Sequence, residues 1–209
     1  MGISSRKQKE KEDLTKSILK AARELFIEKG YDETSIRNIA QRIEYSPTTI
    51  YLYFKDKDAI FYALHSEGFG LLNSRMMVLQ HVSEPSERLK AMGRIYLGFA
   101  MENPELYDLM FTLKAPMNVV NSEEHTNWQE GKTAFDLLQM TVADCINVGY
   151  LTFTNVEAAS FLIWSAMHGM ITLYTRQRCK VISDENVDTI IEKGYEQLVQ
   201  MFDVMKKSV

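Results

Sequence analysis

Hydrogen-bonding side chains gather in the short segment from Ser46 to Lys57 of this 209-residue chain. They are Ser46, Thr48, Thr49, Tyr51, Tyr53 and Lys57. Hydroxyl and ammonium groups bond to phosphate oxygens, and the N-terminus of a helix adds free N–H groups and the positive end of its dipole. Short polar side chains can also reach base edges, as can Arg37 shortly before the segment. These residue types predict contact with a nucleic acid.

The elements around this segment predict how it is positioned. Apolar residues recur at helical spacing over about 14–29 and 34–43, and the third expected helix covers about 47–53. Ser46 suits an N-cap and Pro47 a first helical position. The turn before them has only three residues, which is typical of a helix-turn-helix, whose second helix enters the major groove. The alternative is a short amphipathic core helix whose tyrosines pack inward.

The stretches Thr34-Ser35-Ile36-Arg37-Asn38-Ile39-Ala40 and Tyr45-Ser46-Pro47-Thr48-Thr49-Ile50-Tyr51-Leu52-Tyr53-Phe54-Lys55-Asp56-Lys57 resemble the DNA-binding domain of the TetR/AcrR family of transcriptional regulators. The Ile-Tyr-x-Tyr-Phe-x-x-Lys core is the most specific part of this resemblance, which covers about residues 14–62. It implies an all-helical homodimer with a ligand-binding C-terminal domain. It also implies that DNA contacts fall on Arg37, Ser46, Pro47, Thr48, Thr49, Tyr51, Tyr53 and Lys57.

Two positions depart from the family pattern. Glu44 stands in the turn where the family usually has glycine, and Thr48 stands where glycine is frequent. A residue other than glycine is costly at positive φ, so we expect a slightly rebuilt turn. The acid at position 44 would face DNA phosphates unfavourably.

Charge divides the chain into two parts. The whole chain has net charge −4, but residues 1–57 hold 12 Lys/Arg against nine Asp/Glu, and residues 58–209 hold 12 against 19. We predict a mobile basic arm over 1–13, a helix-turn-helix domain over 14–57, and a helical ligand-binding and dimerisation domain over 58–209. Arg6, Lys7, Lys9 and Lys11 are expected to make DNA affinity depend on salt.

The remaining helices are predicted from apolar periodicity and from prolines and caps at their starts, giving an all-α fold. Their expected ranges are 57–80, 85–101, 104–112, 125–148, 155–178 and 184–206, with a loop over 114–124. Thr154 and Glu157 have the spacing of a capping box. Gly30 and Gly149 are predicted to end helices.

Aromatic and methionine side chains on these helices predict an apolar pocket, because such residues line adaptable sites. The candidates are Tyr96, Phe99, Tyr107, Met110, Phe111, Trp128, Phe135, Trp164, Met167 and His168. Any one of them can equally be a core residue. Residues 164–169 resemble the Trp-x-x-x-His-Gly motif of a subgroup of the family, and the family resemblance implies dimerisation through about 155–178 and 184–206.

Several function classes are disfavoured by what the sequence lacks. We find no catalytic constellation, phosphate-binding glycine loop or metal-ligand spacing, so we expect no enzyme activity, no cofactor and no metal. The N-terminus lacks an apolar stretch after its charges, which predicts a cytoplasmic protein with Cys145 and Cys179 reduced and buried. Residues 158–175 reach the length of a membrane span, but polar residues within them favour a core or dimer-interface helix.

The prediction is therefore a homodimeric repressor that binds a near-palindromic operator and leaves it when a small apolar or aromatic ligand binds. One alternative is a helical small-molecule-binding protein or enzyme without DNA regulation. Another is a regulator that acts through a partner protein instead of a ligand.

Overall fold

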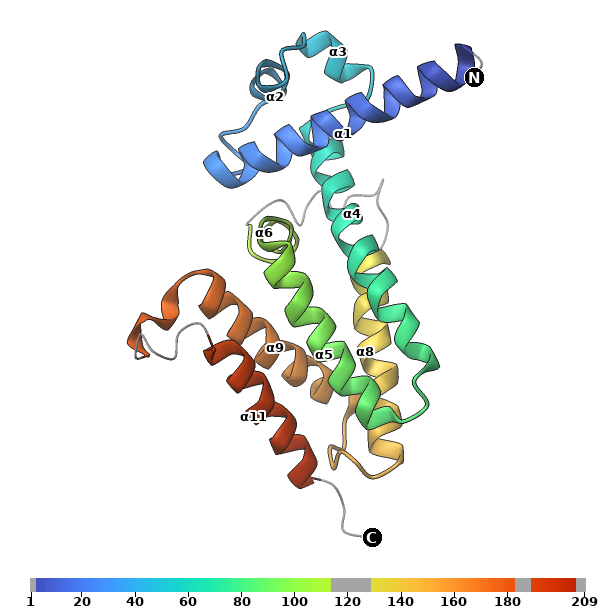
Figure 1. Ribbon diagram of the computed structural model, residues 1–209, viewed down its shortest axis with the longest axis vertical. Coiled ribbons are helices and arrows are strands. Elements are labelled where there is room, and N and C mark those ends of the chain that lie inside the picture. Colours follow the sequence, from blue (N-terminus) through green and yellow to red (C-terminus); the bar gives the residue numbers. More distant parts are fainter. Residues whose placement is uncertain (1–2, 114–128, 183–188, 206–209) are drawn as a thin grey trace. The chain divides into compact units, whose positions relative to one another are not determined.

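The computed structural model describes residues 3–113, 129–182 and 189–205, and these residues form helices with no strand among them (Figure 1). The α-helices are α1 (Ile3–Lys29), α2 (Ile36–Arg42), α3 (Pro47–Tyr51), α4 (Lys57–Met77), α5 (Pro85–Glu102), α6 (Pro104–Phe111), α8 (Gln129–Asn147), α9 (Val156–Thr175) and α11 (Ile190–Met205). Two short 3-10 helices, η1 (Val78–His81) and η3 (Arg178–Val181), follow α4 and α9. The predicted all-α fold is confirmed for these residues.

The predicted starts and ends of the helices are largely confirmed. Pro47, Pro85 and Pro104 occupy the first positions of α3, α5 and α6, where a missing N–H costs nothing. Gly30 and Gly149 have positive φ values of 84° and 75° after α1 and α8. The start of α9 differs by one residue from the prediction.

The cap of α9 is Asn155, not Thr154. The Asn155 side chain accepts a 2.9 Å hydrogen bond from the N–H of Ala158, and α9 begins at Val156. Asparagine serves as well as threonine at an N-cap, so the sequence alone did not separate the two positions. The predicted cap at Ser183, the loop over 114–124 and the first residues of two expected helices lie outside the described residues.

The predicted start of the first helix is wrong, because α1 begins at Ile3 rather than near residue 14. Arg6 pairs with Glu10 at 2.9 Å, and Gln8 bonds to Glu12 at the same spacing of four residues. Such pairs each add a few tenths of a kcal/mol, about 0.2–0.5. Extending an existing helix also avoids the cost of nucleation, so a polar segment without a buried face can continue α1.

The chain divides into two compact units, and the division differs from a cut at residue 57. One unit comprises Met1–Gly70 and Glu105–Trp128, and the other comprises Leu71–Pro104 and Gln129–Val209. The N-terminal unit therefore includes α6, whose Leu109 joins the core formed by α1 to α4. Fully buried Ile18, Phe26, Ile39 and Ile50 are at the centre of that core.

In the C-terminal unit α5 packs on α8 and α9, and α9 packs on α8 and α11. Its core includes Leu89, Val142, Ile163 and Phe202. Cys145 is buried in this core as expected, but Cys179 is only half-buried, because it lies in η3 at the surface. Both thiols are free.

Among the described helices, α9 is long and apolar enough to cross a membrane by length and composition. A helix of this composition also suits a protein core or an interface between subunits. Only 28% of its most apolar stretch is buried within this chain. Phe161, Leu162 and Leu173 are its large apolar side chains that are exposed.

Candidate nucleic-acid interface

Helix α2 is fixed at its start by a reciprocal cap. The Ser35 hydroxyl accepts a hydrogen bond from the N–H of Asn38 at 3.2 Å, and the Asn38 side chain accepts one from the N–H of Ser35 at 3.0 Å. Both orphan donors are thereby satisfied. Ile36, Ile39 and Ala40 face the core, so the exposed Arg37 side chain lies on the opposite side of α2.

The turn after α2 has the hydrogen bonds of a Schellman motif. The N–H of Tyr45 donates to the carbonyl of Ala40 at 2.9 Å, and the N–H of Glu44 donates to that of Gln41 at 3.2 Å. This motif places its C′ residue, here Glu44, in the left-handed region, and φ of Glu44 is 60°. The turn is therefore not rebuilt around the acid. The backbone keeps the glycine conformation and accepts the strain.

Helix α3 begins at Pro47 with Ser46 as its cap. The Ser46 hydroxyl accepts a hydrogen bond from the N–H of Thr49 at 3.2 Å, and its oxygen lies 2.9 Å from the hydroxyl oxygen of Thr49. Ile50 is fully buried and anchors the helix in the core. Ser46 and Thr49 therefore hold the helix start together.

The eight predicted DNA-contact residues are either exposed or half-buried. The exposed ones are Arg37, Ser46, Thr48 and Tyr51. The half-buried ones are Pro47, Thr49, Tyr53 and Lys57. Because α2 and α3 belong to one unit and pack on each other, these eight residues are held by a single small scaffold.

Lys57 is engaged within the protein. Its Nζ donates to the carbonyl of Tyr31 at 2.7 Å and lies 4.0 Å from the centre of the Tyr31 ring. The Tyr31 hydroxyl donates to Asp58, and burial together with this carboxylate raises the pKa of Tyr31. Lys57 thus ties the start of α4 to the end of α1, and its predicted phosphate contact can use only its remaining N–H donors.

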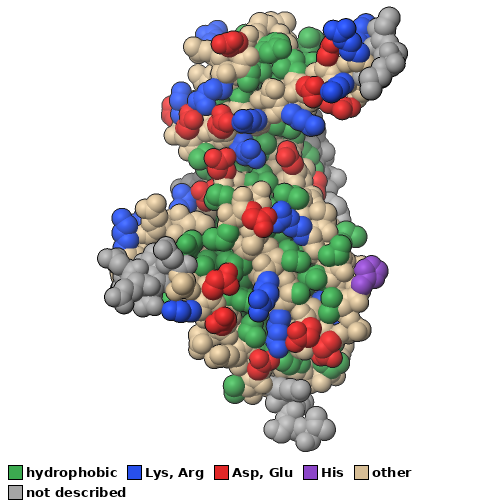
Figure 2. Space-filling view, viewed as in Figure 1, with side chains coloured by type: hydrophobic (Ala, Val, Ile, Leu, Met, Phe, Trp, Pro, Cys, Tyr) green, Lys and Arg blue, Asp and Glu red, His purple; other side chains and the backbone are tan. Residues whose placement is uncertain are grey.

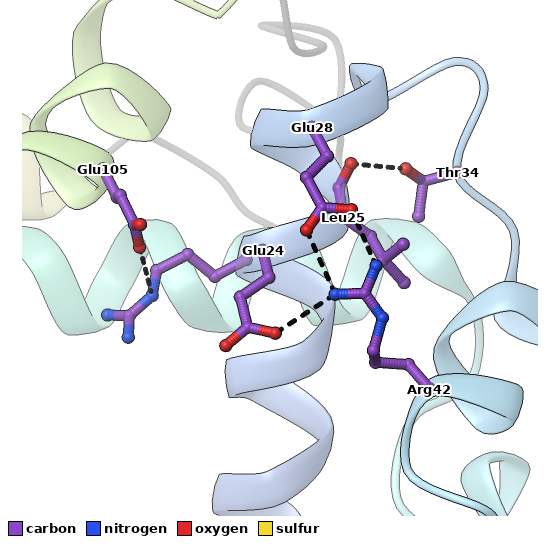
Figure 3. A network of polar contacts seen from close by, with 7 residues as sticks. Glu24, Leu25, Glu28, Thr34, Arg42 and Glu105 are labelled. Carbon is purple, nitrogen blue, oxygen red and sulfur yellow. Dashed lines mark hydrogen bonds and ion pairs between the residues drawn. The ribbon is translucent and has the colours of Figure 1, made fainter.

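An ion pair fixes α2 against α1 (Figure 3). Arg42 donates to Glu28 at 2.7 Å and to Glu24 at 3.3 Å. The hydrogen bond from Arg42 lowers the pKa of Glu28. Beside this pair, the buried Thr34 hydroxyl lies 3.1 Å from the carbonyl oxygen of Leu25, which it can satisfy as a donor.

Two exposed side chains near α3 were missed by the sequence reasoning. Leu52 is 76% exposed and Tyr45 is 49% exposed, although both are large and apolar or aromatic. Hydrogen-bonding side chains are the usual mark of DNA contact, but an apolar side chain can contact the methyl group of thymine. Leu52 occupies the x position of the Ile-Tyr-x-Tyr-Phe core, and that position was the signal in the sequence that could have pointed to its exposure.

Four predicted pocket residues meet in the C-terminal unit. The Trp164 indole N–H donates to the Tyr96 hydroxyl at 3.1 Å, and that hydroxyl lies 3.3 Å from Nδ1 of His168. The Phe135 ring centre is 6.1 Å from that of Trp164. Burial lowers the pKa of His168, so its neutral form predominates at neutral pH. The cluster offers aromatic surface with a few polar groups.

The other pocket candidates lie elsewhere. Tyr107, Met110 and Phe111 belong to α6 in the N-terminal unit, where the Phe111 ring centre is 5.3 Å from that of Phe69. Phe99 and Met167 are buried in the C-terminal unit. Trp128 lies outside the described residues. Among the described residues, no group of three or more His, Cys, Asp or Glu side chains is arranged to hold a metal ion.

Two curated relatives match short segments of this chain. A segment of 52 residues is 44% identical to the HTH-type transcriptional repressor Rv1474c of Mycobacterium tuberculosis, covering 25% of this chain and 28% of the relative. A segment of 68 residues is 37% identical to the fatty acid metabolism regulator protein of Bacillus subtilis, covering 32% and 35%. The matches thus span about a third or less of these relatives.

The fold is shared over most of the chain with solved structures. The transcriptional regulator FadR from Bacillus subtilis, solved in complex with stearoyl-CoA, has a TM-score of 0.70 at 21% identity, covering 88% of this chain and 96% of that one. Family models match both parts of the sequence. Residues 18–64 match the model of bacterial regulatory proteins of the tetR family, and residues 89–198 match the tetracyclin repressor-like C-terminal domain. The chain belongs to the TetR family of bacterial regulatory proteins.

Proposed function

We propose that this protein is a cytoplasmic, homodimeric transcriptional repressor that leaves a near-palindromic DNA operator when a small ligand binds its C-terminal domain. The observation that carries the proposal is the capped, exposed α3. A strained turn, a side-chain cap and an ion pair to α1 together hold five residues of helix at the surface. Such rigid display of a short helix is what reading a major groove requires.

The proposed division of labour follows from exposure and chemistry. Arg37, Thr48 and Thr49 are short or bidentate hydrogen-bonding residues suited to base edges. Tyr51 is exposed and suited to a phosphate, while Tyr53 and Lys57 are half-buried and suited to positioning the helix on the backbone.

The proposed ligand is small and apolar or aromatic. The Tyr96, Trp164, His168 and Phe135 cluster supports it, because ligand sites combine apolar walls with a few oriented polar groups. The complex of FadR from Bacillus subtilis with stearoyl-CoA makes long-chain acyl compounds the first class to test here.

The proposed dimer forms through α9 and α11. Hydrophobic side chains reach the surface of the C-terminal unit (Figure 2). On α9, Phe161 and Leu162 are 59% and 55% exposed, and on α11 Met201 and Val204 are also exposed. Exposed apolar side chains are unfavourable in water, so covering those of α9 and α11 with a second copy would stabilise the assembly.

In such a dimer, ligand binding would bias the distance between the two copies of α3. Two half-sites one helical turn apart require a separation of roughly 34–36 Å. A coupling free energy of about 1–3 kcal/mol changes operator affinity by roughly 5–150-fold, so the ligand needs only a modest preference for one spacing.

The test is selection of genomic DNA fragments on the purified full-length protein, with Tyr51→Ala as the control. Recovery of a near-palindromic site that the control does not retain supports the proposal. Tyr51→Phe should then weaken binding to all sequences alike, whereas Thr49→Ala should alter sequence preference. A protein of dimer mass that enriches no sequence over the control would refute sequence-specific regulation.

A further inference from the structure

A cavity of about 490 Å³ lies in the C-terminal unit, where the ends of α5 and α9 meet η3. This volume falls within the range of small-molecule sites, about 300–1,000 Å³. Ala100, Met101 and Pro104 give it an apolar wall, and Tyr174 adds an aromatic ring. Lys180 and Cys179 from η3 line it as well. None of these residues belongs to the Tyr96–Trp164–His168 cluster.

Charge is distributed unusually around this cavity. Residues 58–209 carry an excess of acidic residues, yet residues 158–183 contain no Asp or Glu and include Arg176, Arg178 and Lys180. Tyr174, Cys179 and Lys180 of this acid-free stretch line the cavity.

The other cations of this unit provide a contrast. Arg75, Arg88, Lys90 and Lys132 each pair with a carboxylate at 2.6–3.1 Å. Within the part of the chain that the structure describes, Arg178 and Lys180 form no ion pair. Both side chains are exposed, and Lys180 lines the cavity.

Cations also stabilise the C-terminus of a helix, and Arg176 at the C-cap of α9 is placed for that role. Lys180 lies five residues beyond the end of α9, outside the last turn where the dipole acts. Its position beside an apolar wall is better suited to a ligand that has both an apolar chain and a negative charge.

We propose that this cavity binds the anionic end of an amphiphilic acyl ligand, with Ala100, Met101 and Pro104 contacting the chain and Lys180 contacting the negative group. The proposal rests on the proposed function: it adds a negative group to the apolar ligand and places that end in a cavity separate from the Tyr96–Trp164–His168 cluster. A carboxylate and the phosphates of an acyl-CoA share the negative charge that the Lys180 ammonium recognises.

The native cysteines allow a test of location. Cys179 lines the cavity and is half-buried, so a maleimide can reach it, and ligand bound there should block it. Cys145 is fully buried, and burial raises the pKa of its thiol to about 12, so it serves as an unreactive internal reference. Labelling of each cysteine is followed by mass spectrometry of the full-length protein after digestion.

The probes are dodecanoyl-CoA, dodecanoate, free CoA and the neutral 1-dodecanol. A probe present at ten times its Kd should slow labelling of Cys179 about tenfold. Protection by dodecanoyl-CoA but not dodecanoate assigns the site to phosphates, and protection by both assigns it to a single negative charge. Equal protection by 1-dodecanol at equal concentration, or no protection by either anionic chain, overturns the proposal.

The variant is Lys180→Gln, and Lys132→Gln, which removes an exposed cation of α8 in the same unit, is the matched control. We expect Lys180→Gln to bind the protecting probe about two- to threefold more weakly, from one exposed charge contact, and the control to bind it normally. Unchanged affinity in Lys180→Gln overturns the proposal. DNA binding by the wild type is measured in parallel: DNA binding without protection of Cys179 refutes this inference alone, and protection without DNA binding refutes the proposed repressor alone.

Discussion

Replacing Glu44 with glycine should stabilise the N-terminal unit. Glu44 is the C′ residue of α2 with φ of 60°, a conformation that costs an L-residue about 1–2 kcal/mol. Glycine removes that cost but brings back about 0.5–1 kcal/mol of backbone entropy in the unfolded chain. The expected net gain is about 0.5–1 kcal/mol, or roughly a two- to fivefold rise in the folded-to-unfolded ratio.

The assay is hydrogen exchange of the α2 amides, which reports on this unit without assuming that both units unfold together. Glu44→Ala is the control, because it removes the carboxylate but keeps the Cβ that makes φ costly. Glu44→Ala should leave exchange protection unchanged, while Glu44→Gly should raise it. Equal protection in both variants would refute the backbone argument and place the cost in the carboxylate.

Operator affinity should respond to the charge of Glu44 and not to its backbone conformation. Both substitutions remove one negative charge beside α3, so both should strengthen operator binding equally, by up to about fivefold for unit charges 4 Å apart in water.

The Schellman hydrogen bonds found after α2 also end α8, where the N–H of Tyr150 donates to the carbonyl of Cys145 and Gly149 occupies the C′ position with φ of 75°. Gly149→Ala should therefore destabilise the C-terminal unit by about 0.5–1 kcal/mol, the same net difference with the opposite sign.

Three further outcomes are expected. Thr34→Val should lower the free energy of unfolding, measured by urea denaturation, by about 1–2 kcal/mol, because the buried Thr34 hydroxyl bonds to the carbonyls of Leu25 and Gly30. Thr34→Ser keeps the hydroxyl and should retain most of the stability, so equal losses in the two variants would contradict this role. The pKa of His168 is lowered on folding, so as pH falls the unfolded chain binds the extra proton before the folded chain does. The free energy of unfolding should therefore decrease as pH drops below about 6.5. The difference between the Tm values at pH 7.5 and pH 5.5 should be smaller in His168→Gln than in the wild type. If Leu52 contacts a thymine methyl, replacing that thymine with deoxyuridine should weaken operator binding by the wild type but not by Leu52→Ala, and equal losses in both proteins would exclude the contact.

The helices and the starting positions of several were predictable from local signals. A proline at the first helical position, Ser46 as a cap and glycine after α8 each satisfy a requirement of one helix end. Such requirements are met by residues adjacent in sequence, so no knowledge of tertiary contacts was needed.

The role of Lys57 and the membership of α6 could not be predicted in this way. Lys57 bonds to the carbonyl of Tyr31, 26 residues earlier, and Leu109 of α6 completes the core of the N-terminal unit. Neither partner is marked by local spacing. Only the folded chain brings them within reach.

An all-helical chain with a helix-turn-helix near its N-terminus follows from local signals, because caps, breakers and apolar periodicity act within a few residues. How those elements are used depends on contacts between residues far apart in the sequence. Tertiary structure held Glu44 in a glycine conformation, since the Schellman bonds and the packing of α2 on α3 leave no other path for the turn. It also brought Tyr96 to Trp164 and His168, and put Lys180 beside the α5 wall, because these residues come from helices far apart in the sequence.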